Sequence, residues 1–143
     1  MTTIGLLGTG DMGAAVGRAL GGHGHRVLTS LAGRSERSSA LAAAAGIADV
    51  GSLEALLKEC ELVLSILPPA AAPAAAGQAA AAMASPFPTY VDCNAVSPQT
   101  AAKIAALVQA VGAPFIDCSI IGAAPGKGVP PRFFVSGADT TAM

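Results

Sequence analysis

The sequence predicts an α/β fold, a doubly wound parallel sheet with helices on both faces in a single three-layer domain. Short apolar runs alternate with helical patterns along most of the 143 residues, as they do where helices connect parallel strands. The composition is 52% hydrophobic and only 12% charged, which suits strands that are covered on both faces. This length is typical of one domain with its own core, so we expect residues 1–143 to form one domain.

The individual elements follow from apolar runs, caps and breakers. Strands are expected where short apolar runs end at turn residues, at 4–7, 25–29, 47–50, 61–67, 89–93, 114–119 and 132–136. Helices are expected in Ala-rich stretches that begin after a glycine turn, serine or proline, at 11–20, 35–46, 52–59, 70–84 and 97–111. Pro73 is tolerated only in the first turn of its helix. The segment 120–131, rich in Gly and Pro, is predicted to be a loop.

The turn after the first strand carries the pattern GxGxxG. Gly8 allows a tight turn, Gly10 leaves room for a diphosphate against the backbone, and Gly13 lets the helix approach the strand. The free N–H groups of the first helical turn and the helix dipole favour an anion there. We therefore predict a Rossmann-type dinucleotide site that includes Gly8, Thr9, Gly10, Asp11, Met12 and Gly13. The alternative is a glycine-rich turn that binds nothing.

Charge and composition exclude several classes of function. The net charge is −1 and the pI is about 6.0, so we expect no surface for nucleic acid or for an anionic membrane. The chain opens on a strand rather than a leader, and the Ala tract is too short and too weakly hydrophobic to span a bilayer. We therefore expect a cytoplasmic protein.

The cysteines and histidines are expected to have no catalytic or metal-binding role. Cys60, Cys93 and Cys118 are far apart and lack metal-ligand spacing, so we expect them to be reduced and buried, with no metal site. His23 and His25 lie in the turn before the second strand, where surface roles are expected.

The residues at the end of the second strand indicate which dinucleotide cofactor the site prefers. A NAD site has an acid at this position to bind the ribose hydroxyls, but the segment 28–33 contains none. Arg34, Ser35 and Arg37 follow instead, and guanidinium groups with a hydroxyl suit a 2′-phosphate. We therefore predict NADP(H) in preference to NAD(H), and the missing acid also disfavours S-adenosylmethionine and flavin. The alternative is a solvated helix start with incidental arginines.

These motifs together resemble the N-terminal domain of the 6-phosphogluconate dehydrogenase and 3-hydroxyisobutyrate dehydrogenase superfamily, the β-hydroxyacid dehydrogenases. Within it, the chain looks most like a poorly characterised branch with a distinct helical C-terminal domain. The resemblance covers nearly the whole chain and is carried by the segments 4–13, 33–35, 64–68, 91–98 and 115–122. It implies an enzyme that transfers hydride between a nicotinamide and a small hydroxy acid or related carbonyl compound.

The resemblance also implies site residues beyond the glycine turn. Leu67 and Pro68 would lie along the cofactor, and Asn94 and Ala95 would approach the nicotinamide. For Asn94, a buried turn residue that fixes its own backbone is the equal alternative. Substrate contacts are expected at Ser119, the last residue of the sixth strand, and at Gly122 in the loop that follows it. In the family's substrate motif a serine stands where this chain has Ile121, so a carboxylate substrate would lose a hydroxyl donor.

The family's catalytic lysine and its helical domain lie beyond residue 143, so no catalytic residue is expected in this chain. Lys103 and Lys127 are expected to be solvated charges. We therefore predict cofactor binding without turnover, and a homodimer for the full-length form. The alternative is a stand-alone dinucleotide-binding or regulatory module. An exposed apolar face is then expected near Ile120, Ile121, Val129, Phe133 and Phe134.

Overall fold

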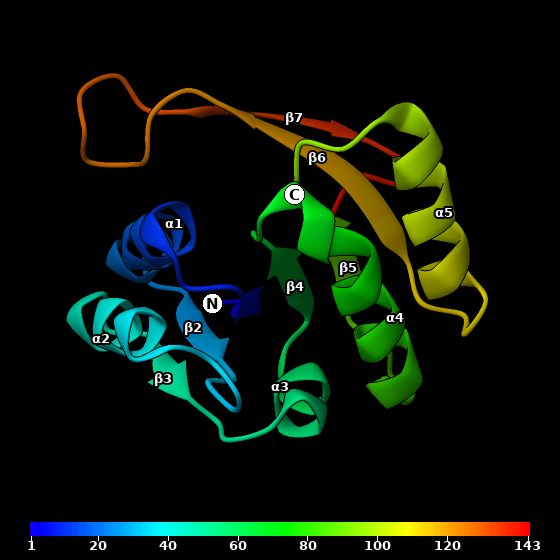
Figure 1. Ribbon diagram of the computed structural model, residues 1–143, viewed down its shortest axis with the longest axis horizontal. Coiled ribbons are helices and arrows are strands. Elements are labelled where there is room, and N and C mark those ends of the chain that lie inside the picture. Colours follow the sequence, from blue (N-terminus) through cyan, green and yellow to red (C-terminus); the bar gives the residue numbers. More distant parts are fainter.

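The computed structural model describes residues 1–143 as a seven-stranded sheet with helices on both faces (Figure 1). The strand order is β3-β2-β1-β4-β5-β6-β7; the first six strands run parallel, and β7 is antiparallel to β6. This arrangement confirms the predicted doubly wound α/β fold. The strands are β1 (Thr3–Leu7), β2 (Arg26–Thr29), β3 (Ala48–Asp49), β4 (Leu62–Ser65), β5 (Thr89–Asp92), β6 (Phe115–Ile121) and β7 (Arg132–Ser136).

Four of the five helices begin within one residue of the predicted position, and the fourth helix begins at Ala72, two residues later than predicted. The side chains of Ser35, Ser52 and Ser97 each accept a hydrogen bond from the backbone N–H three residues later, which caps three helices. Pro73 lies in the first turn of its helix, after a short 3₁₀ turn at Pro69–Ala71. The helices are α1 (Asp11–Gly22), α2 (Glu36–Ala44), α3 (Leu53–Glu59), α4 (Ala72–Ala82) and α5 (Pro98–Gln109). No helix combines the length and the apolar character needed to cross a bilayer.

The two faces of the sheet carry separate cores. On one face α1 and α2 contribute Val16 and Ala42 to a cluster that includes Leu6 and Ile116. On the other face α3, α4 and α5 pack over a second apolar cluster, which includes the fully buried Tyr90. The first face is covered unevenly, because the only helices that contribute to its cluster are α1 and α2. Figure 1 shows both next to β2, away from β5 and β6.

Strand β6 is longer than the sequence predicts. Ile120 and Ile121, expected in the following loop, pair with Phe133 and Arg132 of β7. The strand continues because β7 folds back beside it and supplies partners for its backbone groups. Strand β4 is shorter than the sequence predicts. It ends at Ser65, and the next two residues, expected in the strand, leave the sheet at its carboxyl edge.

Candidate dinucleotide-binding site

The strand order reverses between β1 and β4, and this switch point locates the candidate site. Strands β2 and β3 lie on one side of β1, while β4, β5 and β6 lie on the other. Connections leave β1 and β4 in opposite directions, which opens a crevice at the carboxyl ends of the strands, where ligands of such sheets bind. Gly8 follows β1 and Ile66 follows β4, so the predicted glycine turn lies at this crevice.

The three motif glycines have distinct surroundings. Gly8 has a φ of +94°, and a Cβ added there would collide with the carbonyl oxygen of Ile66. A Cβ at Gly13 would collide with the carbonyl oxygen of Gly8, because α1 lies directly against the turn. Nothing lies within 4 Å of the Cβ position at Gly10, so this side of the turn is open. The protein thus requires glycine at two positions and leaves free space at the third.

Helix α1 begins without a side-chain cap. Its N-cap is Gly10, whereas α2, α3 and α5 begin with serine caps. The first amides of a helix have no intrahelical acceptor, so those of Asp11, Met12 and Gly13 are free to bind an anion. The Thr9 side chain is turned away from this space. Its hydroxyl is buried and donates to the carbonyl oxygen of Ser38 over 2.9 Å, which fixes the turn to α2.

Arg34 lies beside the glycine turn, although 26 positions separate it from Gly8 (34 minus 8). Both residues line one hollow of about 140 Å³ at the switch point. The remaining residues of this hollow are Leu7, Ser30, Ala32, Leu53, Leu67, Ala75 and Gln78. Ser30 directly follows β2, in the segment that lacks an acid, and no carboxylate lines the hollow. The lining therefore combines five apolar residues with two polar side chains and one cation.

Ser35 and Arg37 have partners within the chain. The Ser35 hydroxyl accepts from the Ser38 N–H over 3.1 Å and caps α2. The Arg37 guanidinium donates to the Asp11 carboxylate over 2.7 Å, and both side chains are exposed. No local sequence pattern predicts this ion pair, because its members are far apart in the chain.

The predicted residues at the ends of β4 and β5 lie side by side. Asn94 is buried, and its Oδ1 accepts from the Leu67 N–H over 2.7 Å. Its Nδ2 donates to Ser65 Oγ over 3.1 Å and to Asp92 Oδ2 over 3.3 Å, and its own N–H donates to Asp92 Oδ1 over 3.0 Å. Asn94 thus fixes the turn after β4 as well as its own backbone. Pro68 and Ala95, at the tips of these two turns, are exposed.

Asp92 is a buried carboxylate with an altered acidity. Burial raises the pKa of its carboxyl above the ordinary value of 3.8, the Asn94 hydrogen bonds oppose this rise, and the nearby Asp117 carboxylate adds to it. Asp117 lies next to Asp92 in the register of β5 and β6. No lysine or arginine forms an ion pair with Asp92, since the two ion pairs of the chain are elsewhere.

The three cysteines are free, and all are buried, as predicted. Burial raises the pKa of the Cys60 thiol to about 11. The Cys93 and Cys118 thiols lie beside each other, and this contact, together with burial, raises the pKa of the Cys93 thiol. No local sequence pattern predicts this contact, because it depends on the register of β5 and β6, which places the two cysteines one position beyond the pair Asp92 and Asp117. No group of three or more possible metal ligands is present.

The predicted substrate positions lie apart from the hollow. Ser119 is an exposed residue of β6 opposite Phe134, and Gly122 follows the end of this strand. Strands β4 and β5 separate β6 from β1, and neither residue lines the hollow beside Gly8. Lys103 and Lys127 are exposed, as expected. Lys127 lies in the loop after β6, which faces the outer side of α1.

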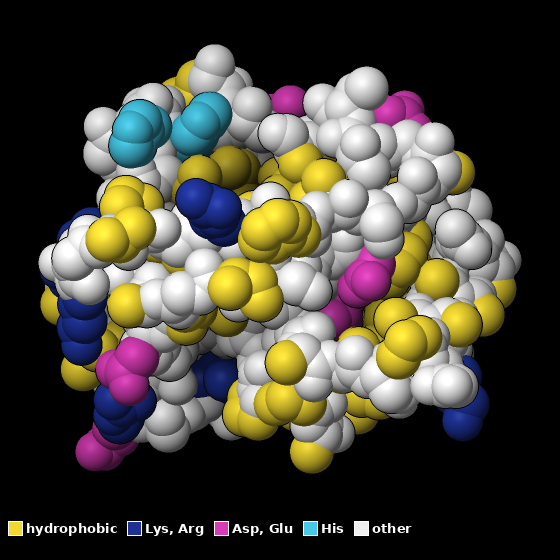
Figure 2. All heavy atoms as spheres, turned by 90° about the horizontal axis from the view of Figure 1, so that it is seen from above, with side chains coloured by type: hydrophobic (Ala, Val, Ile, Leu, Met, Phe, Trp, Pro, Cys, Tyr) yellow, Lys and Arg dark blue, Asp and Glu magenta, His cyan; other side chains and the backbone are white.

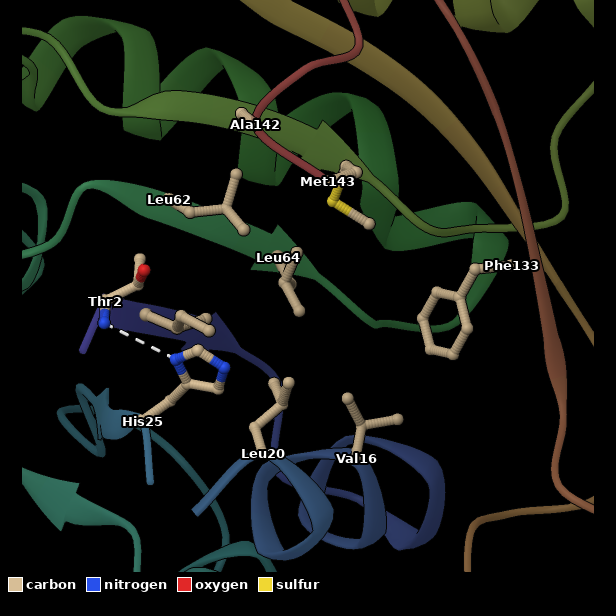
Figure 3. A pocket seen from close by; sticks show the side chains of 10 residues that line it. Thr2, Val16, Leu20, His25, Leu62, Leu64, Phe133, Ala142 and Met143 are labelled. Atoms are coloured by element: carbon tan, nitrogen blue, oxygen red, sulfur yellow. Dashed lines mark hydrogen bonds between the residues drawn. The ribbon is translucent and has the colours of Figure 1, made fainter. Parts of the chain in front are cut away.

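A larger apolar pocket of about 290 Å³ lies toward the opposite edge of the sheet (Figure 3). Thr2 and His25, which precede β1 and β2, lie at this pocket, and the Thr2 N–H donates to His25 Nδ1 over 3.4 Å. Side chains of β1, β4 and α1 form the walls, and Phe133 and Met143 close it. Because the glycine turn does not line it, we do not assign this pocket to the dinucleotide.

Apolar side chains are exposed near the end of the chain, as the sequence predicts. The exposed fractions are 58% for Ile121, 84% for Val129, 37% for Phe133 and 56% for Phe134, whereas Ile120 is half-buried. Figure 2, which looks at the molecule from the side of β6 and β7, shows hydrophobic side chains gathered on this face.

Comparisons with known proteins agree with this geometry. A family model described as the NAD binding domain of 6-phosphogluconate dehydrogenase matches residues 3–142. Proteins of Mycobacterium bovis and Mycobacterium tuberculosis, each named a probable 3-hydroxyisobutyrate dehydrogenase, are 29% identical over the whole chain. The chain spans 48% of the length of these relatives.

Solved structures show the same fold. A conserved protein of unknown function, described as similar to 3-hydroxyacid dehydrogenases, superposes with a TM-score of 0.83 at 29% identity, over 96% of this chain and 50% of that one. The M. tuberculosis 3-hydroxyisobutyrate dehydrogenase with L-serine gives a TM-score of 0.80 at 26% identity, over 99% and 48%. An imine reductase of Streptomyces aurantiacus gives 0.76 at 25% identity, over 94% and 47%.

Proposed function

Because the chain belongs to the family of NAD-binding domains of 6-phosphogluconate dehydrogenase, we propose that it binds NADP(H) in preference to NAD(H). The observation that carries this proposal is the hollow at the switch point, where Arg34 lies beside Gly8 and no carboxylate is present. A carboxylate there would bind the ribose hydroxyls of NAD and repel a 2′-phosphate. An arginine forms two parallel hydrogen bonds to a phosphate.

The residues at the crevice fit each part of such a cofactor. The uncapped amides of Asp11, Met12 and Gly13 would donate to the diphosphate, which passes over the open side of Gly10. Arg34 would bind the 2′-phosphate, and the apolar walls of the hollow would contact the adenine. Ser35 and Arg37, at the start of α2, would support this end of the site.

The nicotinamide end would lie along the turns after β4 and β5. Leu67 and Pro68 form the first turn, and Asn94 and Ala95 form the second. Both Pro68 and Ala95 are exposed at the crevice edge of the sheet. When bound, the nicotinamide supplies or accepts the hydride. The residues of this chain would bind and orient it, and Ser119 and Gly122 remain the proposed contacts to a substrate.

The complete protein is proposed to be an oxidoreductase that acts on a small hydroxy acid or a related carbonyl compound. Relatives named as 3-hydroxyisobutyrate dehydrogenases support this reaction class, and the imine reductase uses the same fold. Such a reaction requires a group that donates or accepts a proton at the substrate oxygen. Lys103 and Lys127, the lysines considered for this role, are exposed and absent from the hollow. We therefore expect this chain to bind cofactor without turnover, as one domain of a homodimeric enzyme.

The test is calorimetric titration of the purified chain with NADPH and with NADH. We expect NADPH to bind more tightly, and Arg34→Ala to lower the NADPH affinity about tenfold or more while NADH changes by about twofold or less. Arg26→Ala is the control, because Arg26 forms an exposed ion pair with Glu59 at the opposite edge of the sheet. Tighter binding of NADH, or an equal loss for both cofactors, would refute the assignment.

A further inference from the structure

Three buried polar residues connect the carboxyl ends of β4 and β5. Ser65 and Asp92 are fully buried, and 5% of Asn94 is exposed. Four hydrogen bonds connect Asn94 to the ends of the two strands, two with the Asp92 carboxylate, one with the Ser65 hydroxyl and one with the Leu67 backbone. We call these three residues the Asn94 clamp. It links the last residue of β4 to the turn that follows β5.

Stability alone is a poor explanation for the Asn94 clamp. Burying a carboxylate without a cation is unfavourable, and apolar residues at such positions often stabilise a fold equally well. Here the nearby Asp117 carboxylate adds further negative charge, as the raised pKa of Asp92 indicates. The hydrogen bonds instead fix one particular geometry, because Asn94 can satisfy all four only when both turns are in place.

The hydrogen bond to Leu67 carries this geometry to the candidate site. Leu67 lines the hollow together with Gly8 and Arg34, and its N–H is bound by Asn94 Oδ1 over 2.7 Å. The carbonyl of the preceding residue, Ile66, lies against Gly8. On the other side, the Val96 N–H donates to the Asn94 carbonyl over 3.0 Å, which closes the turn that presents Ala95. One amide side chain therefore sets the positions of both turns.

We propose that the Asn94 clamp positions the turns after β4 and β5 for the nicotinamide half of the cofactor, with Asp92 as the positioning residue behind it. This inference rests on the proposed function. Asp92 has no exposed surface, so it acts through Asn94 and does not touch the cofactor. The clamp affects the adenosine half less, because Leu67 is the only residue of the hollow that Asn94 binds, whereas Arg34 and Ser30 belong to the turn after β2.

A carboxylate is required at position 92 because of the number of acceptors. Asp92 accepts from both the N–H and the Nδ2 of Asn94. An asparagine there has the same size, but it accepts through one oxygen only and presents an NH₂ group to the Asn94 NH₂ group. In Asp92→Asn an NH₂ group therefore faces one of these two donors of Asn94, so at least one hydrogen bond of the clamp is lost. The exchange Asp92→Asn with Asn94→Asp restores complementary donors and acceptors.

The experiment compares two ligands on the same chain. NADPH carries the nicotinamide, whereas adenosine 2′,5′-bisphosphate carries only the adenosine, the 2′-phosphate and one 5′-phosphate. We expect Asp92→Asn to lower the NADPH affinity about tenfold and to change bisphosphate binding by about twofold or less. The double exchange should recover most of the NADPH affinity. Ser65→Ala, which removes one acceptor of the Asn94 amide, should give a smaller loss with the same selectivity and serves if Asp92→Asn does not fold.

Asp139→Asn is the matched control. Its carboxylate also accepts two hydrogen bonds from a residue two positions later, but it lies in the exposed segment after β7. It should leave both affinities unchanged. Unchanged NADPH binding by the clamp variants, or a parallel loss of both ligands, would overturn the positioning role. A wild-type chain that binds the bisphosphate as tightly as NADPH would also overturn it, because the nicotinamide half would then add no affinity. If the wild type binds neither ligand, the proposed function fails and the clamp proposal fails with it.

Discussion

At the scale of single residues, the site depends on which side chains are already bonded within the chain. Arg34 lines the hollow at the switch point, whereas the Arg37 guanidinium is paired with Asp11 at the start of α1. From the sequence, both arginines are equal candidates to bind a phosphate, since both lie at the start of one helix. Their contacts separate them, and Arg34 is the better candidate for recognition of the 2′-phosphate. An exposed pair such as Arg37 with Asp11 contributes at most about 1 kcal/mol to stability.

The motif glycines can be tested by two matched substitutions. Gly13→Ala places a Cβ against the Gly8 carbonyl, so we expect the free energy of unfolding to fall by about 1–3 kcal/mol. Gly10→Ala places a Cβ in open space, so it should change stability by about 0.5 kcal/mol or less and still weaken NADPH binding. Urea denaturation and calorimetry measure the two quantities. A stable Gly13→Ala variant, or a Gly10→Ala variant with wild-type affinity, would contradict this division of roles.

Asp92 predicts a pH dependence with a defined sign. Its native pKa is raised above the ordinary value of 3.8, chiefly by burial, and the groups that face it are Asn94, Asp117, Tyr90 and Cys93. Between 3.8 and the native pKa, the folded chain binds more protons than the unfolded chain. The contribution of Asp92 to the free energy of unfolding is therefore present at low pH and is lost as the pH rises through the native pKa.

The Asp92→Asn variant isolates this contribution. The difference in the free energy of unfolding between wild type and variant should fall as the pH is raised from about 4 to about 7. Urea denaturation at several pH values measures it. A difference that stays constant or grows with pH would contradict the raised pKa.

At the scale of elements, helix starts depend on neighbouring residues in the sequence, whereas strand ends depend on distant parts of the chain. The starts of α2, α3 and α5 depend on serine caps that lie one residue before the helix, so short patterns predict them. The end of β6 depends on β7, which pairs with it across a loop, so the sequence pattern placed Ile120 and Ile121 in the loop. The end of β4 at Ser65, two residues early, likewise depends on the neighbouring turns.

Strand β7 is the exposed edge strand of the sheet, and we expect the chain to self-associate through it. All five of its residues are exposed, and Phe133, Phe134 and Val135 are consecutive apolar residues in it. An unpaired apolar edge is a template for pairing with a second chain. We expect the chain to form dimers or larger species, and Phe134→Lys to shift it toward the monomer without changing cofactor affinity. Analytical ultracentrifugation measures the species, and a monomeric wild type at high concentration would contradict this expectation.

At the scale of the whole molecule, one topological feature places the site. The strand order turns at β1 and β4, so the glycine turn, the residues after β2 and the turns after β4 and β5 converge on one edge of the sheet. The larger apolar pocket lies toward the other edge and is closed by Phe133 and Met143. The position of a hollow relative to the carboxyl ends of the strands is therefore a better guide to the candidate ligand site than the volume of the hollow.

The sequence by itself determined the fold class, the glycine turn and the serine caps. These features depend on neighbours within a few positions, because periodicity, capping and turn formation act over short distances along the chain. Tertiary structure alone decided that Arg34 lines the hollow while Arg37 pairs with Asp11, and that Asn94 joins two strands through Asp92 and Ser65. Such contacts join residues that are far apart in sequence, and only the packing of the sheet brings their atoms within hydrogen-bond distance.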